Sequence, residues 1–212
     1  MRLIGVIDPG HGGKDPGAIG AKLKIAEKDL TLAYALDLGK ELISRGHSIT
    51  LTRRKDEYLS LGSRTEIANK LRPWADFFVS IHFDQSKYPT AQGTWAFYHN
   101  TISYADGKPI RETPSRLGQP LAGCLVKHVV ESAGTRNRGT APRPMYKFQD
   151  GEMEKVEGQL YVLRQSKPWA SLIEIGFLSN AGDEANTVKA EFRQRVVQGM
   201  ANGIEAWAKN YL

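Results

Sequence analysis

Four side chains that lie far apart in the sequence are of the types that metal-assisted hydrolysis uses. They are His11, Glu27, His82 and Glu174. Two imidazoles and one carboxylate form the ligand set of catalytic zinc in several hydrolases, and a water molecule takes the fourth position. Bound zinc lowers the pKa of that water from about 15.7 to about 7, so that hydroxide forms at neutral pH. We therefore take His11, Glu27 and His82 as candidate ligands of Zn²⁺.

Glu174 is the candidate for proton transfer. It interrupts an apolar run that extends from Ala170 to Leu178, and a charge buried in such a run is costly unless it is paired or used. A carboxylate beside the metal could take the proton of the water and later protonate the leaving nitrogen. An ion pair with an arginine such as Arg164 is the structural alternative. Two histidines and a carboxylate could also hold non-haem iron, but an acid–base glutamate beside the metal favours hydrolysis.

The glycine-rich loop that carries His11 does not fit three other glycine-loop motifs. A dinucleotide-binding fingerprint requires a glycine where this chain has Asp15. A phosphate-binding P-loop would end in Gly-Lys-Ser/Thr, and a lipase-type loop would accompany a Gly-x-Ser-x-Gly elbow; the chain contains neither sequence. Metal ligation by His11 remains, beside the alternative of a tight turn with an incidental histidine.

Each candidate, taken singly, also has an ordinary structural explanation. Glu27 lies in the first turn of a predicted helix, where the helix N-terminus stabilises an acid, and His82 could be a hydrogen-bonded core histidine. Asp8 ends the first apolar run and could accept the second ring proton of a ligating histidine, although it could equally be a turn residue. Arg64 is more typical of a structural residue.

The predicted elements bring the candidates to one edge of a sheet. Apolar runs predict strands at residues 3–8, 47–52, 76–82, 93–99, 159–164 and 170–180. Apolar residues at helical spacing predict helices at residues 27–45, 59–71, 117–133, 183–190 and 192–208. This alternation predicts an α/β fold with a twisted, mostly parallel sheet flanked by helices on both faces. Ligands bind outside the carboxyl ends of such strands, where His11, Glu27 and His82 would meet.

The segment 134–157 is rich in glycine, proline and charge. We expect it to be a long surface loop, and its basic residues suggest a substrate rim for an anionic glycan or peptide. These residues are Arg136, Arg138, Arg143 and Lys147.

Composition limits the class of protein. With 212 residues, 25% of them charged and 41% apolar, the chain is long enough for one well-cored domain over residues 1–212, and neither disorder nor a membrane span is indicated. The N-terminal apolar run is too short for a secretory signal. The single cysteine, Cys124, excludes an internal disulfide and a cysteine-based zinc site. The net charge of +6 suggests an anionic partner.

Several blocks of residues occur together, in one order, over nearly the whole chain. They are Asp8-Pro-Gly-His-Gly-Gly13 with Asp15 and Gly17, Glu27, Thr52-Arg53 with Asp56, Leu61, Arg64, Ala68 and Asn69, Ala75-Asp76 through Ser80-Ile-His82, and Val162-Leu-Arg164 before Glu174-Ile-Gly-Phe-Leu-Ser-Asn180. In this combination the chain resembles the catalytic domain of the zinc-dependent N-acetylmuramoyl-L-alanine amidases of the Amidase_3 family, known from bacterial cell-wall amidases and phage endolysins. Where the family commonly has a small residue and asparagine after the second histidine, this chain has Phe83 and Asp84.

The resemblance implies that His11, Glu27 and His82 hold zinc and that Glu174 is the catalytic acid and base. The implied reaction is hydrolysis of the amide between the lactyl group of N-acetylmuramic acid and the L-alanine of the stem peptide in peptidoglycan. We expect a monomer that acts on a muramyl-peptide, without nucleic acid or membrane as partner. The sequence shows no repeat or second module that could serve as a separate wall-binding domain. We expect synthesis in the cytoplasm and release to the wall as for a phage endolysin, or else secretion with a leader absent from this sequence.

Two other functions stay open at this point. One is a zinc peptidase that cuts within the stem peptide. The other, from a different class, is a non-catalytic module that binds nucleic acid or an anionic wall polymer through its basic residues, with affinity that falls steeply as salt rises. No nucleic-acid-binding motif is visible in the sequence, which makes the second function the weaker alternative.

Overall fold

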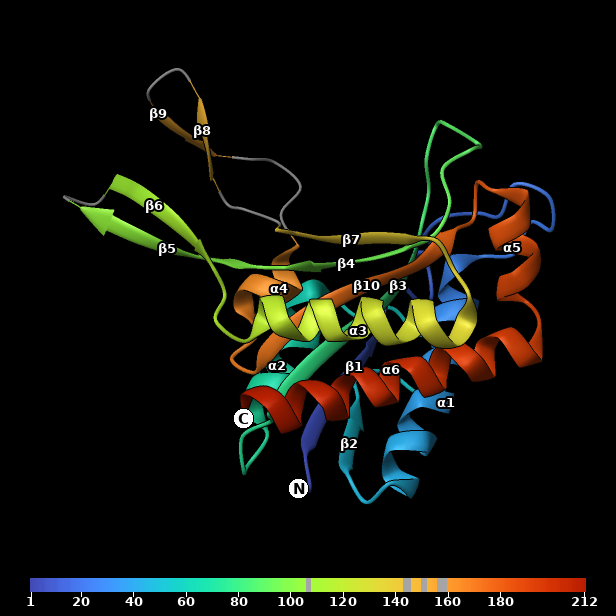
Figure 1. Ribbon diagram of the computed structural model, residues 1–212, viewed down its shortest axis with the longest axis horizontal. Helices are drawn as coiled ribbons and strands as arrows, with labels where there is room; N and C mark the ends of the chain where they lie inside the picture. Colours follow the sequence, from blue (N-terminus) through green and yellow to red (C-terminus); the bar gives the residue numbers. More distant parts are fainter. Residues whose placement is uncertain (106–107, 143–145, 150–151, 156–159) are drawn as a thin grey trace.

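The apolar runs of the sequence form the strands of a six-stranded sheet, in the order β2-β1-β3-β10-β4-β7 (Figure 1). The computed structural model describes residues 1–105, 108–142, 146–149, 152–155 and 160–212. The strands of this sheet are β1 (Ile4–Pro9), β2 (Ser48–Leu51), β3 (Phe77–Asp84), β4 (Thr94–Tyr98), β7 (Asn137–Pro142) and β10 (Trp169–Phe177). Neighbouring strands are parallel except β10 and β4, which are antiparallel.

Helices cover both faces of the sheet. They are α1 (Glu27–Ser44), α2 (Leu61–Lys70), α3 (Gly118–Ala133), α4 (Tyr161–Gln165), α5 (Ala181–Thr187) and α6 (Ala190–Tyr211). In β1, the adjacent residues Val6 and Ile7 point to opposite faces, and each belongs to a different hydrophobic core. The predicted α/β fold, with a mostly parallel sheet and helices on both faces, is thus confirmed.

The two faces are covered unequally. The larger core lies under the long helices α1, α3 and α6, and it includes the fully buried Tyr34 and Trp207. The smaller core lies under α2 and α4, which have only 10 and 5 residues. Alternate residues of β3 and β10 reach this thinly covered face, where Phe78 and Leu172 are buried. The carboxyl ends of these strands therefore continue into space that the short helices leave open.

Two hairpins project from the sheet (Figure 1). One is formed by β5 (Asn100–Ala105) and β6 (Lys108–Pro114), and the other by β8 (Tyr146–Gln149) and β9 (Glu152–Lys155). Both are antiparallel pairs separate from the central sheet. Within the described residues, no helix has the length and apolar character needed to span a bilayer.

The prediction of a long surface loop at residues 134–157 is wrong. β7 pairs in parallel with β4 at the edge of the sheet, and β8 pairs with β9; residues 143–145, 150–151 and 156–157 of this segment lie outside the described residues. β7 is an edge strand whose side chains are exposed or half-buried. Backbone pairing with β4, and not burial of side chains, keeps this strand in the sheet. Its sequence therefore lacks the apolar pattern from which buried strands are predicted.

The prediction of a short strand at residues 159–164 is also wrong. Residue 159 lies outside the described residues, and Tyr161–Gln165 form the helix α4. Val162 and Leu163 are both buried in the smaller core, so the short apolar run reflects burial. A run of this length does not distinguish a strand from one buried helical turn.

Candidate metal centre

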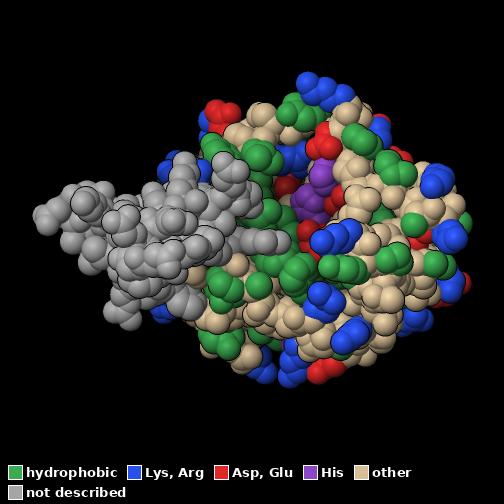
Figure 2. Space-filling model, turned by 90° about the horizontal axis from the view of Figure 1, so that it is seen from above, with side chains coloured by type: hydrophobic (Ala, Val, Ile, Leu, Met, Phe, Trp, Pro, Cys, Tyr) green, Lys and Arg blue, Asp and Glu red, His purple; other side chains and the backbone are tan. Residues whose placement is uncertain are grey.

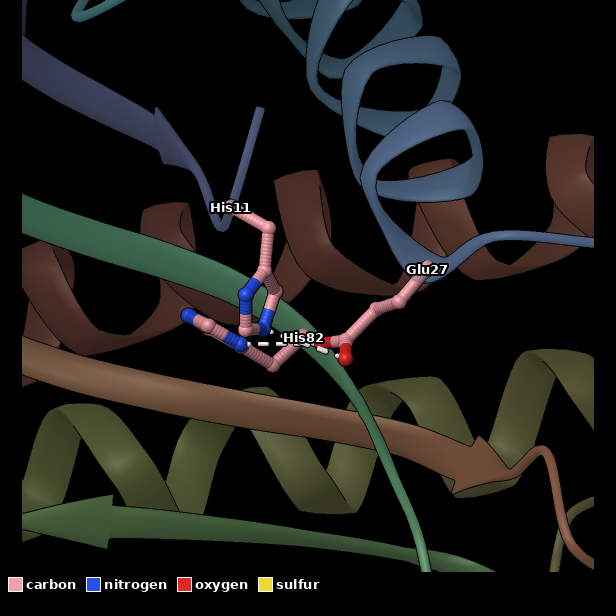
Figure 3. Close-up of side chains that lie close together, drawn as sticks. All are labelled: His11, Glu27 and His82. Carbon is pink, nitrogen blue, oxygen red and sulfur yellow. Dashed lines mark hydrogen bonds and ion pairs between the residues drawn. The ribbon is translucent and has the colours of Figure 1, made fainter. Parts of the chain in front are cut away.

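The turn after β1 places His11 over the end of β3. The backbone N–H of Gly10 donates to the carbonyl of Ile81, 3.1 Å away, and His11 follows with φ of 58°, in the left-handed region that residues with a side chain rarely adopt. His82 lies in β3 itself, and Glu27 is the first residue of α1. The chain thus delivers a loop residue, a strand residue and a helix residue to the same edge of the sheet, as Figure 3 shows.

Both imidazoles face the carboxylate of Glu27 (Figure 3). Its Oε1 is 2.9 Å from Nδ1 of His82, and its Oε2 is 3.1 Å from Nε2 of His11. The two imidazole rings meet edge to face, with centroids 4.9 Å apart. One ligand atom from each of the three residues lies within 4.8 Å of the others. The sequence-predicted ligands are therefore brought together, and their donor set, two nitrogens and one oxygen, suits zinc.

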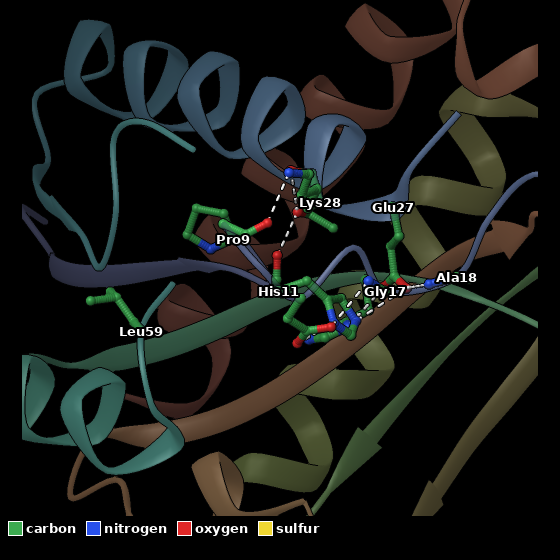
Figure 4. Close-up of polar contacts among 12 residues, drawn as sticks. Pro9, His11, Gly17, Ala18, Glu27, Lys28 and Leu59 are labelled. Carbon is green, nitrogen blue, oxygen red and sulfur yellow. Dashed lines mark hydrogen bonds and ion pairs between the residues drawn. The ribbon is translucent and has the colours of Figure 1, made fainter. Parts of the chain in front are cut away.

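Burial and hydrogen bonding fix the charge of Glu27. The side chain is buried, and its oxygens accept hydrogen bonds from the backbone N–H of Ala18 at 2.8 Å (Figure 4) and from that of Phe83 at 3.0 Å. Burial acts to raise the pKa of Glu27, but the hydrogen bonds and charges of both imidazoles outweigh it and hold this pKa well below its ordinary value. Glu27 is therefore an anionic group prepared for a cation.

The pKa of His11 is shifted in the opposite direction. Burial acts to lower it, whereas the hydrogen bond and charge of Glu27, followed by those of Asp15, outweigh burial and raise it. Asp15 reaches Nδ1 of His11 at 2.9 Å, while Nε2 faces Glu27. A carboxylate on the far nitrogen orients a metal-binding imidazole and increases its basicity. Asp15 was matched to the family's motif but not predicted as a partner of His11; its position four residues after His11 in a tight glycine loop is the signal that could have indicated it.

Asp8 has different partners from the one that the sequence suggested. Its carboxylate accepts hydrogen bonds from Thr52 at 2.6 Å and Ser80 at 2.8 Å, and it forms an ion pair with Arg64 at 2.8 Å. Asp8 was considered as the hydrogen-bond acceptor for a candidate metal-binding histidine. In the structure, Asp15 is the residue that contacts His11 in this way. The physical reason is register: Asp8 pairs with Ser80 in the ladder between β1 and β3, so the two side chains project from the same face, and Ser80, Thr52 and Arg64 occupy the carboxylate of Asp8.

Gly17 is required by close approach. Its φ is 66°, and a side chain at this position would collide with the carboxylate of Glu27 and the ring of His11. The backbone N–H of Gly17 also donates to Asp15 at 3.1 Å. The loop between β1 and α1 can therefore fold tightly around the ligands only with glycine here.

Arg64 supports the strained backbone of the His11 loop, as expected of a structural residue. Its buried guanidinium donates to the carbonyls of Pro9 and His11, both at 2.6 Å, while it pairs with Asp8. Replacing Arg64 by alanine leaves the buried Asp8 carboxylate unpaired and frees the left-handed turn. We expect a loss of roughly 3–5 kcal/mol in the free energy of unfolding, the usual cost of breaking a buried ion pair from one side.

Urea unfolding of Arg64→Ala measures this loss directly. Arg195→Ala is the matched control, because Arg195 is exposed on α6, and it should change stability by less than about 0.5 kcal/mol. Equal stability of the two variants would contradict the structural role given to Arg64.

The three candidate ligands, His11, Glu27 and His82, form a cluster, called the ligand cluster below. This cluster opens into a cavity of about 500 Å³. His11, His82 and Glu174 line it together with Asp8 and Asp15. A more apolar part of its lining comes from the segments that lead into α2 and α4 and from the first residues of these helices; it includes Tyr58, Leu59, Leu61, Leu160, Tyr161 and Val162. Figure 2 shows histidine side chains at the base of a hollow, with acidic and basic side chains on its rim and hydrophobic side chains to one side.

Glu174 faces this cavity from β10. It is the register partner of His82 in the parallel ladder between β10 and β3, and residues opposite each other in a ladder project from the same face of a sheet. The acid predicted for proton transfer therefore lines the same cavity as the candidate ligands, from the neighbouring strand.

The comparisons with known proteins agree with this fold. The chain belongs to the Amidase_3 family, described as N-acetylmuramoyl-L-alanine amidase, which it matches over residues 6–206. The catalytic domain of CwlV, an N-acetylmuramoyl-L-alanine amidase from Bacillus (Paenibacillus) polymyxa, is 31% identical and superposes with a TM-score of 0.79, covering 99% of both chains.

Two curated relatives are longer than this chain. A probable N-acetylmuramoyl-L-alanine amidase of Haemophilus influenzae, AmiB, is 31% identical over 95% of this chain and 51% of its own length. The sporulation-specific N-acetylmuramoyl-L-alanine amidase of Bacillus subtilis is 33% identical over 94% of this chain and 66% of its own length. The chain thus spans about half to two thirds of the length of these two relatives.

Proposed function

We propose that the chain hydrolyses the amide between N-acetylmuramic acid and the L-alanine of the stem peptide in peptidoglycan, with zinc as cofactor. The observation that carries the proposal is the buried Glu27 carboxylate, which faces both His11 and His82, next to a cavity that His11, His82 and Glu174 line. The membership of the chain in an amidase family supports the choice of substrate. The place of action is the cell wall, and the working unit is a monomer.

His11, Glu27 and His82 would hold the zinc ion. When bound, zinc supplies a Lewis acid that polarises a carbonyl and lowers the pKa of water. Glu27 contributes the negative charge. The backbone N–H groups of Ala18 and Phe83 donate hydrogen bonds to its carboxylate and keep it in place. Asp15 holds the imidazole of His11 so that Nε2, and not Nδ1, faces the ligand cluster. The protein thus contributes a fixed donor set and its orientation.

Glu174 would move the proton. From its position opposite His82, it takes a proton from the attacking water and passes it to the nitrogen of L-alanine as the amide breaks, so that the carboxylate is restored at the end of the cycle. The peptide leaves with a free N-terminal amine, and the sugar retains its lactyl carboxylate. The release of N-terminal alanine is therefore the signature of this reaction.

Asp15→Ala tests the support given to His11. Removal of an outer carboxylate from a ligating histidine commonly weakens metal affinity by roughly 10- to 100-fold, and we expect zinc affinity to fall within this range. Competition with a chromogenic zinc chelator measures the affinity without relying on turnover. Asp37→Ala, on the half-buried surface of α1, is the control; an unchanged affinity in Asp15→Ala would show that His11 needs no such partner.

Mass spectrometry of digested sacculi tests the reaction itself. Purified peptidoglycan is incubated with the zinc-loaded protein, and the products are examined for free stem peptides that begin with L-alanine. Products cut between stem-peptide residues would instead indicate a peptidase, and binding to the wall polymer without any product would indicate a non-catalytic module.

A further inference from the structure

The face of the sheet that carries Glu174 continues into an aromatic row on β4. Glu174 is paired with His82 on one side and with Trp95 on the other. Because paired residues project from the same face, Trp95 lies beside the acid on the side away from the ligand cluster. His82, Glu174 and Trp95 thus follow one another across three neighbouring strands.

An irregularity in β10 enlarges this row. The register of β10 against β3 shifts between Glu174 and Phe177, and the ring of Phe177 comes to lie 6.3 Å from that of Trp95, tilted by 30°. The indole N–H of Trp95 donates to Asp84 at 2.9 Å, and the ring of Phe97 packs against it edge to face at 4.5 Å. Asp84 therefore fixes the N–H edge of the Trp95 ring, and Phe97 packs against this ring.

A bulge in β7 places a cation over these rings. Opposite Trp95, β7 has two residues, Arg138 and Gly139, between paired positions of the ladder. Gly139 has φ of 75°, and its N–H donates to the side chain of Asn137 at 2.7 Å, which stabilises the bulge. Bulges re-aim side chains and are common next to active sites. Here the bulge aims the exposed Arg138 at the aromatic row.

The guanidinium of Arg138 lies over both rings. The carbon at the centre of its guanidinium lies 5.1 Å from the centroid of Trp95 and 4.9 Å from that of Phe177. A weak hydrogen bond of 3.5 Å joins it to the carbonyl of Gln92, and within the described residues it takes part in no ion pair. A guanidinium that lies over aromatic rings keeps its N–H donors for a ligand. Its planar fork matches a carboxylate.

The two sides of the scissile amide differ in charge. On the sugar side the lactyl carboxyl is consumed in the amide, so that side is neutral. On the peptide side, the second residue of the stem is a glutamate linked through its side chain, and its α-carboxyl is either free or amidated. Resting on the proposed amidase function, we propose that Arg138, on its Trp95 and Phe177 platform, binds the free α-carboxylate of this second residue and makes the chain selective for unamidated stem peptides.

Calorimetry with two synthetic peptides tests this selectivity without requiring turnover. The peptides are L-Ala-γ-D-Glu-L-Lys and the same tripeptide with the α-carboxyl of its glutamate amidated, each titrated into the zinc-loaded protein. We expect the wild-type chain to bind the acid about tenfold or more tightly than the amide, as for a hydrogen-bonded charge pair. Arg138→Gln should lose this preference, Arg138→Lys should keep part of it, and Arg195→Gln, with the same change of charge on α6, should keep all of it.

Two results would overturn the proposal: equal binding of both peptides by the wild-type chain, or an undiminished preference in Arg138→Gln. The wild-type comparison decides alone if Arg138→Gln does not fold. Hydrolysis of the corresponding muramyl-peptides is measured separately. A chain that prefers the acid peptide but cuts neither muramyl-peptide would contradict the amidase function and leave the carboxylate site standing.

Discussion

Glu174→Gln should lower the turnover of muramyl-peptide by about 10²- to 10⁴-fold, the usual contribution of a positioned acid or base. Glutamine has nearly the same shape as glutamate but cannot take the proton of water at neutral pH. Because the three candidate ligands are other residues, bound zinc should remain at the wild-type level. The rate of release of N-terminal alanine and the metal content are measured on the same preparation.

The two readouts separate proton transfer from structural damage. Glu191→Gln is the matched control, because Glu191 is exposed in the first turn of α6, and it should retain wild-type turnover. If Glu174→Gln turned over substrate at the wild-type rate, this result would contradict the acid–base role of Glu174. If it lost zinc together with activity, Glu174 would instead belong to the metal site.

Glu27→Ala should lose zinc as well as activity. Glu27 is the charged member of the ligand cluster, and both imidazoles face its carboxylate. Without it, two neutral nitrogens and a void remain, and zinc affinity should fall by more than the roughly 10- to 100-fold that the loss of an outer partner costs. Bound zinc per chain after dialysis against a zinc buffer, read by plasma emission spectrometry, should be well below one.

Asp29→Ala is the matched control for this loss. Asp29 is the other acid in the first turn of α1, so its removal changes the charge at the same helix end without touching the cluster. It should bind zinc like the wild-type chain. Full zinc occupancy in Glu27→Ala would show that the metal uses other ligands.

The positions of the candidate ligands were predictable because they follow from the ends of strands. His11 comes directly after the first apolar run and His82 lies near the end of the third, and the carboxyl ends of parallel strands share one edge. Glu174 stood out as an acid inside an apolar run. These patterns are local in the sequence, so they can be recognised without knowledge of tertiary contacts.

The partners of these residues were less predictable, because they depend on register between strands. The choice between Asp8 and Asp15 as the partner of a histidine is decided by the pairing of Asp8 with Ser80, which the sequence does not reveal. β7 and the bulge that aims Arg138 are likewise products of pairing with β4. Charge indicated a basic rim in this region, but only the bulge identifies which arginine reaches the aromatic row.

The central claim is that one zinc ion is held by the imidazoles of His11 and His82 and the carboxylate of Glu27, with Glu174 beside it. Anomalous diffraction at the zinc absorption edge, from crystals grown with zinc, tests it most directly. We predict a single strong peak bounded by these three side chains, about 2.0–2.2 Å from each ligand atom, with Glu174 facing the remaining open position. A peak at another site, or no peak in zinc-saturated crystals, would contradict the account.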